Sequence, residues 1–156
     1  MIQFATADEL AAVVGHEIGH VQARHGAERM TMGMANQVLM ASSAVLLENS
    51  EYKQYAGLAV SAMAIGAQYG VILPYNRAHE SEADAIGLSI AAKAGFNPEA
   101  AVSLWHKMKK VAKGAPPEFM STHPAHDTRI RQLQAQLPNV EKIYQLSKQN
   151  SQCIKP

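Results

Sequence analysis

Two histidines and a glutamate near the start of the chain have the spacing of a metal-dependent hydrolase. The stretch His16-Glu17-Ile18-Gly19-His20 has the form H-E-x-x-H, which places the two histidines one helical turn apart on one face. Two neutral imidazoles on one face can ligate a single zinc ion, leaving room for a third protein ligand and a water. Glu17 then lies beside that water, where it can act as general base. The alternative is a pair of histidines on a solvated helix face.

This chemistry requires a helix, and the flanking residues predict one. Thr6-Ala7-Asp8-Glu9 is a capping box, with Thr6 as N-cap and Glu9 three residues later. Apolar residues then recur at three- and four-residue spacing and predict a core-facing stripe: Leu10, Val14, Ile18 and Val21. We predict a helix from Thr6 past His25, with Gly26 as a possible break. His25 is turned off the ligand face, so we expect a polar residue near the helix end.

A catalytic zinc needs a third protein ligand, and a cluster of candidates follows further along the chain. These candidates are His79, Glu80, Glu82 and Asp84. Glu80 and Asp84 are four residues apart, so one carboxylate can bind metal while the other accepts a hydrogen bond from a ligating imidazole. Glu82 lies nearly opposite on such a helix and is expected to point elsewhere. His79 is a competing ligand, and a merely solvated charged turn is the alternative for the whole cluster.

Composition indicates a single helical domain. At 156 residues the chain is long enough for one hydrophobic core, and its apolar share of 47% is rich in the helix formers Ala, Leu and Met. The net charge of +1 gives no global field that would recruit nucleic acid, so no such partner is expected. The single cysteine, Cys153, excludes an internal disulfide and a cysteine-based zinc site.

Two uncharged stretches, 31–47 and 54–76, separate the H-E-x-x-H motif from the third-ligand cluster. Each approaches the roughly 20 apolar residues needed to cross a bilayer, although Gly, Ser, Asn and Gln dilute both. Zinc ligands on both sides of this segment must end on the same side of any membrane, which excludes a single crossing. We therefore expect a buried helical hairpin, with peripheral membrane contact as the alternative.

The rest of the chain also reads as helical. Pro74 can begin a helix that Gly95 ends, and Asn97 can cap the next one, with Pro98 in its first turn. A further helix is predicted from Asp127 to Leu137, ended by Pro138, with a last short helix after it. No alternating strand pattern occurs.

Three motifs in order carry a family resemblance. They are His16-Glu17-Ile18-Gly19-His20, then Asn76-Arg77-Ala78-His79-Glu80-Ser81-Glu82-Ala83-Asp84, then Ser121-Thr122-His123-Pro124 followed by Arg129. Together they resemble metallopeptidase family forty-eight, the gluzincins that include the HtpX membrane proteases and the CAAX prenyl endopeptidase. The closer likeness is to the Oma-type branch and the related bacterial envelope lipoproteins. The resemblance extends from Asp8 to about Leu137.

The resemblance implies roles for seven residues. His16, His20 and Glu80 would bind one zinc ion, Glu17 would be the catalytic base, and Asp84 would support the ligands. His123 and Arg129 match the family's active-site loop and the helix after it, and are the candidates to donate to the developing oxyanion. We therefore expect residues 1–156 to form a single zinc metallopeptidase domain of mainly α, gluzincin-like fold. Because nothing precedes Met1, the family's N-terminal strands are expected to be missing.

The expected function is that of a zinc endopeptidase acting on misfolded or membrane-proximal proteins in quality control. The bacterial cell envelope, either the periplasm or a membrane surface, is the location that the resemblance implies. A polypeptide substrate and possible peripheral membrane contact follow, and the oligomeric state stays open. One alternative is a zinc-bound binding or chaperone-like module with weak or latent peptidase activity. A structural-zinc domain is the other, but a closed site usually takes four ligands, often cysteines.

Overall fold

The structure, a computed structural model, describes residues 6–111 and 126–153, and this part of the chain contains helices and no strands. The elements in chain order are α1 (Ala7–Gln22), α2 (His25–Glu48), the 3-10 turn η2 (Lys53–Tyr55), α3 (Ala56–Ala67), the π-helical turn η3 (Gln68–Ile72), α4 (Leu73–Lys93), α5 (Glu99–Val111) and α6 (His126–Cys153). The mainly α fold expected from composition is confirmed.

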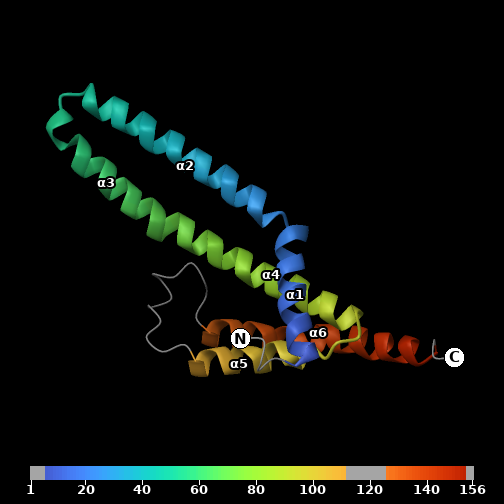
Figure 1. The fold of residues 1–156 in the computed structure, drawn as a ribbon. Coiled ribbons are helices and arrows are strands. Elements are labelled where there is room, and N and C mark those ends of the chain that lie inside the picture. The colour runs from blue at the N-terminus through green and yellow to red at the C-terminus, as the bar shows by residue number, and fades with distance from the viewer. Residues whose placement is uncertain (1–5, 112–125, 154–156) are drawn as a thin grey trace.

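A body and a projecting hairpin make up the molecule (Figure 1). The body contains α1, α5, α6 and the C-terminal part of α4. Its core joins three helices through Leu88 and Ala92 of α4, Ala101 of α5, and Leu133 and Val140 of α6. One arm of the hairpin is α2, and the other is α3 with η3 and the start of α4. The segment from Lys53 to Lys93 continues as one helix from the hairpin into the body.

The first helix is capped as predicted but ends earlier. Thr6 accepts a hydrogen bond from the Glu9 amide at 3.2 Å, and Glu9 accepts one from the Thr6 amide at 2.9 Å. The break falls at Arg24, not at Gly26, because Arg24 takes a left-handed backbone with φ 59° and redirects the chain. Consequently His25 begins α2 instead of ending α1.

The apolar stripe predicted to face the core is exposed, which corrects that expectation. Leu10, Val14, Ile18 and Val21 are between 45% and 78% exposed. The face of α1 that packs against α4 instead carries small residues, Gly15 and Gly19, which are both buried. Spacing alone does not distinguish an apolar stripe from a stripe that allows close backbone approach.

The uncharged segment forms a hairpin as predicted, but the hairpin is not buried. In an apolar stretch of 18 consecutive residues within α2 no residue is buried, and 11% of the residues are buried in the equivalent stretch of the Lys53–Lys93 helix. By length and composition alone, both helices could cross a membrane.

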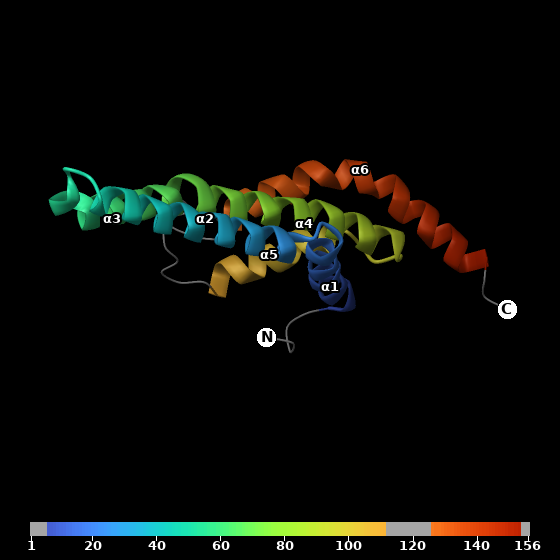
Figure 2. The same cartoon turned by 90° about the horizontal axis from the view of Figure 1, so that it is seen from above.

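Helix ends later in the chain agree with the sequence in one place and depart from it in another. Gly95, with φ 85°, terminates α4 by donating to the Ala92 carbonyl at 3.1 Å. Pro138, however, lies inside α6 and does not end it. Leu133 and Val140 on either side of the proline are both buried in the core, and this burial offsets the lost backbone hydrogen bond. Helix α6 accordingly bends (Figure 2).

Candidate metal centre

Three potential ligands converge where α1 crosses α4. His16 Nε2 lies 3.1 Å from His20 Nε2 and 3.5 Å from Glu80 Oε2, and His20 Nε2 lies 3.4 Å from Glu80 Oε1. The ligand atoms of these three side chains all lie within 4.8 Å of one another, and no other group of three or more such side chains occurs among the described residues. His79 lies outside it.

The spacing of these atoms fits a tetrahedral zinc ion. With metal–ligand distances of about 2.0–2.2 Å, two ligands at the tetrahedral angle lie about 3.3–3.6 Å apart. The three observed separations, from 3.1 to 3.5 Å, agree with that range to within a few tenths of an ångström. Two imidazoles with one carboxylate is also the donor set of a catalytic site, which keeps a position for water or substrate.

Close approach of the two helix backbones makes this convergence possible. A Cβ atom on Gly15 would lie 2.7 Å from the Gly87 carbonyl oxygen, and one on Gly19 would lie 2.7 Å from the Ala83 carbonyl oxygen. Any larger residue at these positions would push α1 away from α4. Since two ligands belong to α1 and one to α4, the glycines set the distance between the ligands.

Asp84 orients the first histidine. Its Oδ1 lies 3.0 Å from His16 Nδ1, and because a carboxylate only accepts, the imidazole donates from Nδ1. In the neutral ring, Nε2 then carries the lone pair and faces His20 and Glu80. A carboxylate behind a histidine in this way fixes the ring orientation in metal sites.

Arg129 holds both carboxylates from α6. Its Nε donates to Asp84 Oδ2 at 2.7 Å and its Nη1 donates to Glu80 Oε2 at 3.2 Å. The guanidinium is 4% exposed and lies over the Trp105 ring at 3.8 Å. These contacts suit a residue that positions the ligands, and they do not favour the oxyanion-donor role expected from the sequence.

The electrostatics of the cluster favour a positive charge at its centre. Burial lowers the pKa of His16, but hydrogen bonds to Asp84 and Glu80 outweigh burial and raise this pKa to about 9. The pKa of His20 is lowered, first by burial and then by the charge on His16. The two carboxylates thus favour one positive charge beside them, and a divalent cation would meet the same two carboxylates.

Sequence reasoning missed the part that His25 takes in this site. His25 is 1% exposed, and its Nδ1 lies 2.8 Å from His20 Nδ1, contrary to the expected polar residue turned off the ligand face. Its Nε2 lies 3.3 Å from Glu82 Oε2, so Glu82 also points toward the site region. The ring stacks on His79 at 4.0 Å. The left-handed residue Arg24 brings His25 back toward His20, and arginine gives no sequence signal for that conformation.

The remaining predicted residues differ in what the structure says of them. Glu17 is exposed, and its side chain makes no hydrogen bond or ion pair with the other described residues. A base that must reach water and substrate has this freedom. His123 falls outside the described residues, so its predicted role stays a prediction.

Comparison with known proteins covers the part of the chain that contains these residues. The model of peptidase family M48 matches residues 1–137. The chain is 34% identical over 148 residues to the mitochondrial metalloendopeptidase OMA1 of Schizosaccharomyces pombe, covering 94% of this chain and 40% of that protein. It is 35% identical over 128 residues to the beta-barrel assembly-enhancing protease of Yersinia pestis, covering 78% and 26%. The human metalloendopeptidase OMA1 is 33% identical over 145 residues, covering 88% and 27%. The chain thus spans at most about two fifths of these relatives. No solved structure matches it.

Proposed function

Because the chain belongs to peptidase family M48, we propose that it is a zinc-dependent endopeptidase of protein quality control, acting on misfolded or membrane-proximal polypeptides. The convergence of His16, His20 and Glu80 carries this proposal. Relatives named as metalloendopeptidases and as a beta-barrel assembly-enhancing protease support it. A location in the bacterial cell envelope stays a prediction, since the relatives include mitochondrial as well as bacterial proteins.

His16, His20 and Glu80 would hold the ion, with Asp84 and Arg129 fixing their orientation. When bound, zinc supplies a Lewis acid that polarises the scissile carbonyl and lowers the pKa of water toward 7. Glu17, next to a ligand and free of side-chain partners among the described residues, accepts the proton of the attacking water. It then delivers that proton to the leaving nitrogen. His123 remains the candidate donor to the developing oxyanion.

One pair of measurements tests the catalytic assignment. Glu17→Gln should keep zinc bound at one ion per chain and lose chelator-sensitive cleavage of casein, because the amide cannot take a proton. Cleavage at the wild-type rate in this variant would remove Glu17 from the mechanism. Zinc binding without any chelator-sensitive cleavage by the wild-type chain would instead favour the binding or chaperone-like module.

A second pair tests the third ligand. Glu80→Ala should lose zinc stoichiometry, whereas Glu82→Ala should retain it, because the Glu82 side chain is 58% exposed and contacts His25 instead of the ligand cluster. These two variants remove the same chemical group from the same helix. The reverse pattern would overturn the ligand set.

A further inference from the structure

The two arms of the hairpin, α2 and the helix from α3 to the start of α4, expose large apolar side chains along their length. Met30, Val38 and Leu46 on α2 are 66%, 68% and 72% exposed, and Leu58 and Ile65 on α3 are 73% and 61% exposed. Water-soluble surfaces rarely carry apolar patches of this extent without a partner. Something other than water must therefore contact the arms.

The distribution of these side chains around α3 points to lipid more than to a protein surface. Leu58 and Ile65 are seven residues apart and share one side of the helix. Met63, which is 37% exposed, points about 140° away from Leu58. A protein docked on one face would leave the other uncovered, whereas hydrocarbon surrounds a helix.

Length and charge agree with a bilayer. Residues 30–47 carry no charged side chain and extend about 27 Å as a helix. Residues 54–76 also carry none and extend about 35 Å. The hydrocarbon core of a bilayer is about 30 Å thick. Charged residues bound both stretches: Arg29 and Arg77 at the base of the hairpin, and Glu48, Glu51 and Lys53 at its turn.

Two serine hydroxyls in the arms donate to carbonyls of their own helix, which suits a low-dielectric environment. The hydroxyl of Ser42 donates to the Val38 carbonyl at 2.6 Å, and the hydroxyl of Ser61 donates to the Gly57 carbonyl at 2.8 Å. Asn36, Gln37 and Gln68 carry the amides in the middle part of the arms, and Asn36 lies 12 residues before the turn whereas Gln68 lies 15 residues after it. Amides at neighbouring levels can pair across two membrane helices.

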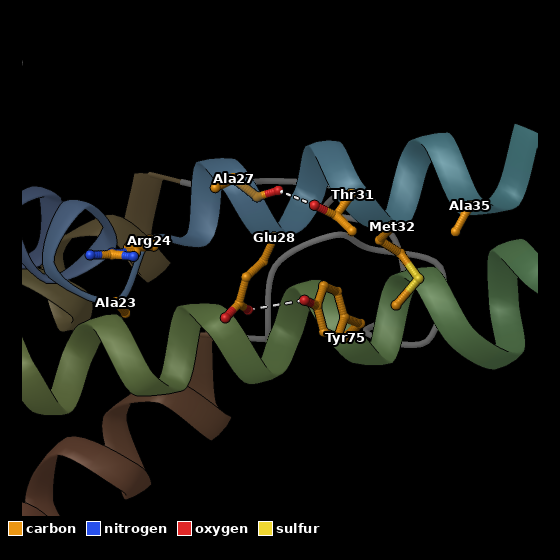
Figure 3. A pocket seen from close by; sticks show the side chains of 8 residues that line it. All are labelled: Ala23, Arg24, Ala27, Glu28, Thr31, Met32, Ala35 and Tyr75. Carbon is orange, nitrogen blue, oxygen red and sulfur yellow. Dashed lines mark hydrogen bonds between the residues drawn. The ribbon is translucent and has the colours of Figure 1, made fainter.

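Aromatic and polar side chains mark the two ends of the hairpin. Tyr52 and Tyr55 at the turn are 67% and 56% exposed, as in the aromatic belts at membrane surfaces. At the base, Tyr75 on α4 donates to Glu28 on α2 at 3.0 Å, beside an apolar pocket that reaches Met32 and Ala35 (Figure 3). This hydrogen bond links the two arms at the base of the hairpin, close to the ends of both uncharged stretches.

We propose that this hairpin crosses a lipid bilayer twice, with the turn at residues 48–53 emerging on the far surface. The body then lies entirely on the near side. Glu80 follows Arg77 by three residues, about 5 Å along the helix, so the metal centre lies at the membrane surface. If the proposed peptidase function holds, its substrates are polypeptide segments that emerge from the bilayer near this hairpin.

Cysteine accessibility tests the crossing. Starting from a Cys153→Ser, Glu17→Gln chain, single cysteines are introduced by Glu51→Cys in the turn, Val38→Cys in α2 and Lys110→Cys in the body. Sealed membrane vesicles from expressing cells are treated with an impermeant maleimide before and after permeabilisation. The positions at 51 and 110 should react from opposite sides of the membrane, and the position at 38 should react only after solubilisation. The result is independent of proteolysis, because the chain lacks its proposed base.

Two outcomes of that experiment would overturn the proposal. One is labelling of positions 51 and 110 from the same side. The other is labelling of position 38 in intact vesicles as fast as position 110, since Val38 is 68% exposed and would react freely in water. Either result would mean that the hairpin does not cross the bilayer.

A charge-insertion pair gives a second, independent measurement. Ile65→Lys, in the middle of an arm, should move the chain from the alkali-resistant membrane pellet to the soluble extract. Tyr52→Lys, at a similarly exposed position in the turn, should leave the chain in the pellet. Retention of the Ile65→Lys chain equal to that of the unmodified chain would contradict a bilayer-spanning arm.

Discussion

Replacing Gly19 by alanine should weaken zinc binding without touching any ligand. The new Cβ would lie 2.7 Å from the Ala83 carbonyl oxygen, whereas ordinary contact begins at 3.4 Å. The obstacle is backbone, so α1 must move away from α4 by about 3.4 − 2.7 = 0.7 Å. His20 adjoins Gly19 and Glu80 precedes Ala83 by three residues, so the ligands separate with the helices.

The expected effect follows from the present ligand spacing. The separation of 3.4 Å between His20 Nε2 and Glu80 Oε1 would open toward about 4.1 Å, beyond the span of a tetrahedral zinc. We expect zinc affinity to fall by about 10- to 100-fold and stability by about 1–3 kcal/mol, as overpacking of a close contact usually costs. Competition with a chromophoric chelator measures the affinity, and circular dichroism checks the fold.

Gly33→Ala is the matched control. A Cβ at Gly33 in α2 would meet no atom within 4 Å, so the same substitution there should leave zinc affinity unchanged. Alanine is also the better helix former, by about 0.8–1.0 kcal/mol. A folded Gly19→Ala chain that binds zinc as tightly as the Gly33→Ala chain would refute the claim that helix proximity sets the metal site.

Three further changes probe the supports of the site and the body. His25→Ala should lower zinc affinity by about 10-fold with the fold intact, because His20 loses its buried partner; equal affinity in chelator competition would remove His25 from the site. Arg129→Lys should weaken zinc binding by about 10- to 100-fold, since one ammonium cannot bridge Asp84 and Glu80 as the guanidinium does. Wild-type zinc affinity of this variant in chelator competition would mean that only the positive charge matters. The Lys107 ammonium chiefly holds the pKa of the buried Glu9 carboxyl below its usual value of 4.5. This pair therefore stabilises the fold above that pH and is lost as pH falls through the lowered value, so Glu9→Gln should flatten the acid side of the pH–stability curve measured by denaturant unfolding.

Local chemistry was the part of this protein that its sequence predicted well. The Thr6–Glu9 capping box and the four-residue spacing of His16 and His20 are properties of one helix, so they can be assigned from adjacent residues. The pairing of Glu80 with Asp84 is also a spacing within one helix. The structure brings both pairs together because two short-range patterns meet at a single crossing.

What the sequence did not predict depends on contacts between elements. Residue spacing cannot show that Gly19 packs against another helix while Ile18 is exposed, because both residues fit a helix. Only the position of α4 determines which face of α1 is buried. Pro138 reads as a helix end until the burial of its neighbours Leu133 and Val140 is known. The exposure of the hairpin was equally hidden, since an uncharged helical stretch looks the same in a core and in lipid.

The crossing of α1 and α4 also bears on the order in which this protein assembles. His20 and Glu80 are 80 − 20 = 60 residues apart, so the metal site closes a 60-residue loop that contains the whole hairpin. Bringing the ends of such a loop together in an unfolded chain costs about 4 kcal/mol of chain entropy. In the folded chain the packing of Gly15 and Gly19 on α4 already holds the two ends of this loop together. The same ligands should therefore bind a metal about a thousandfold more tightly once α1 has packed on α4, so we expect metal binding to follow folding.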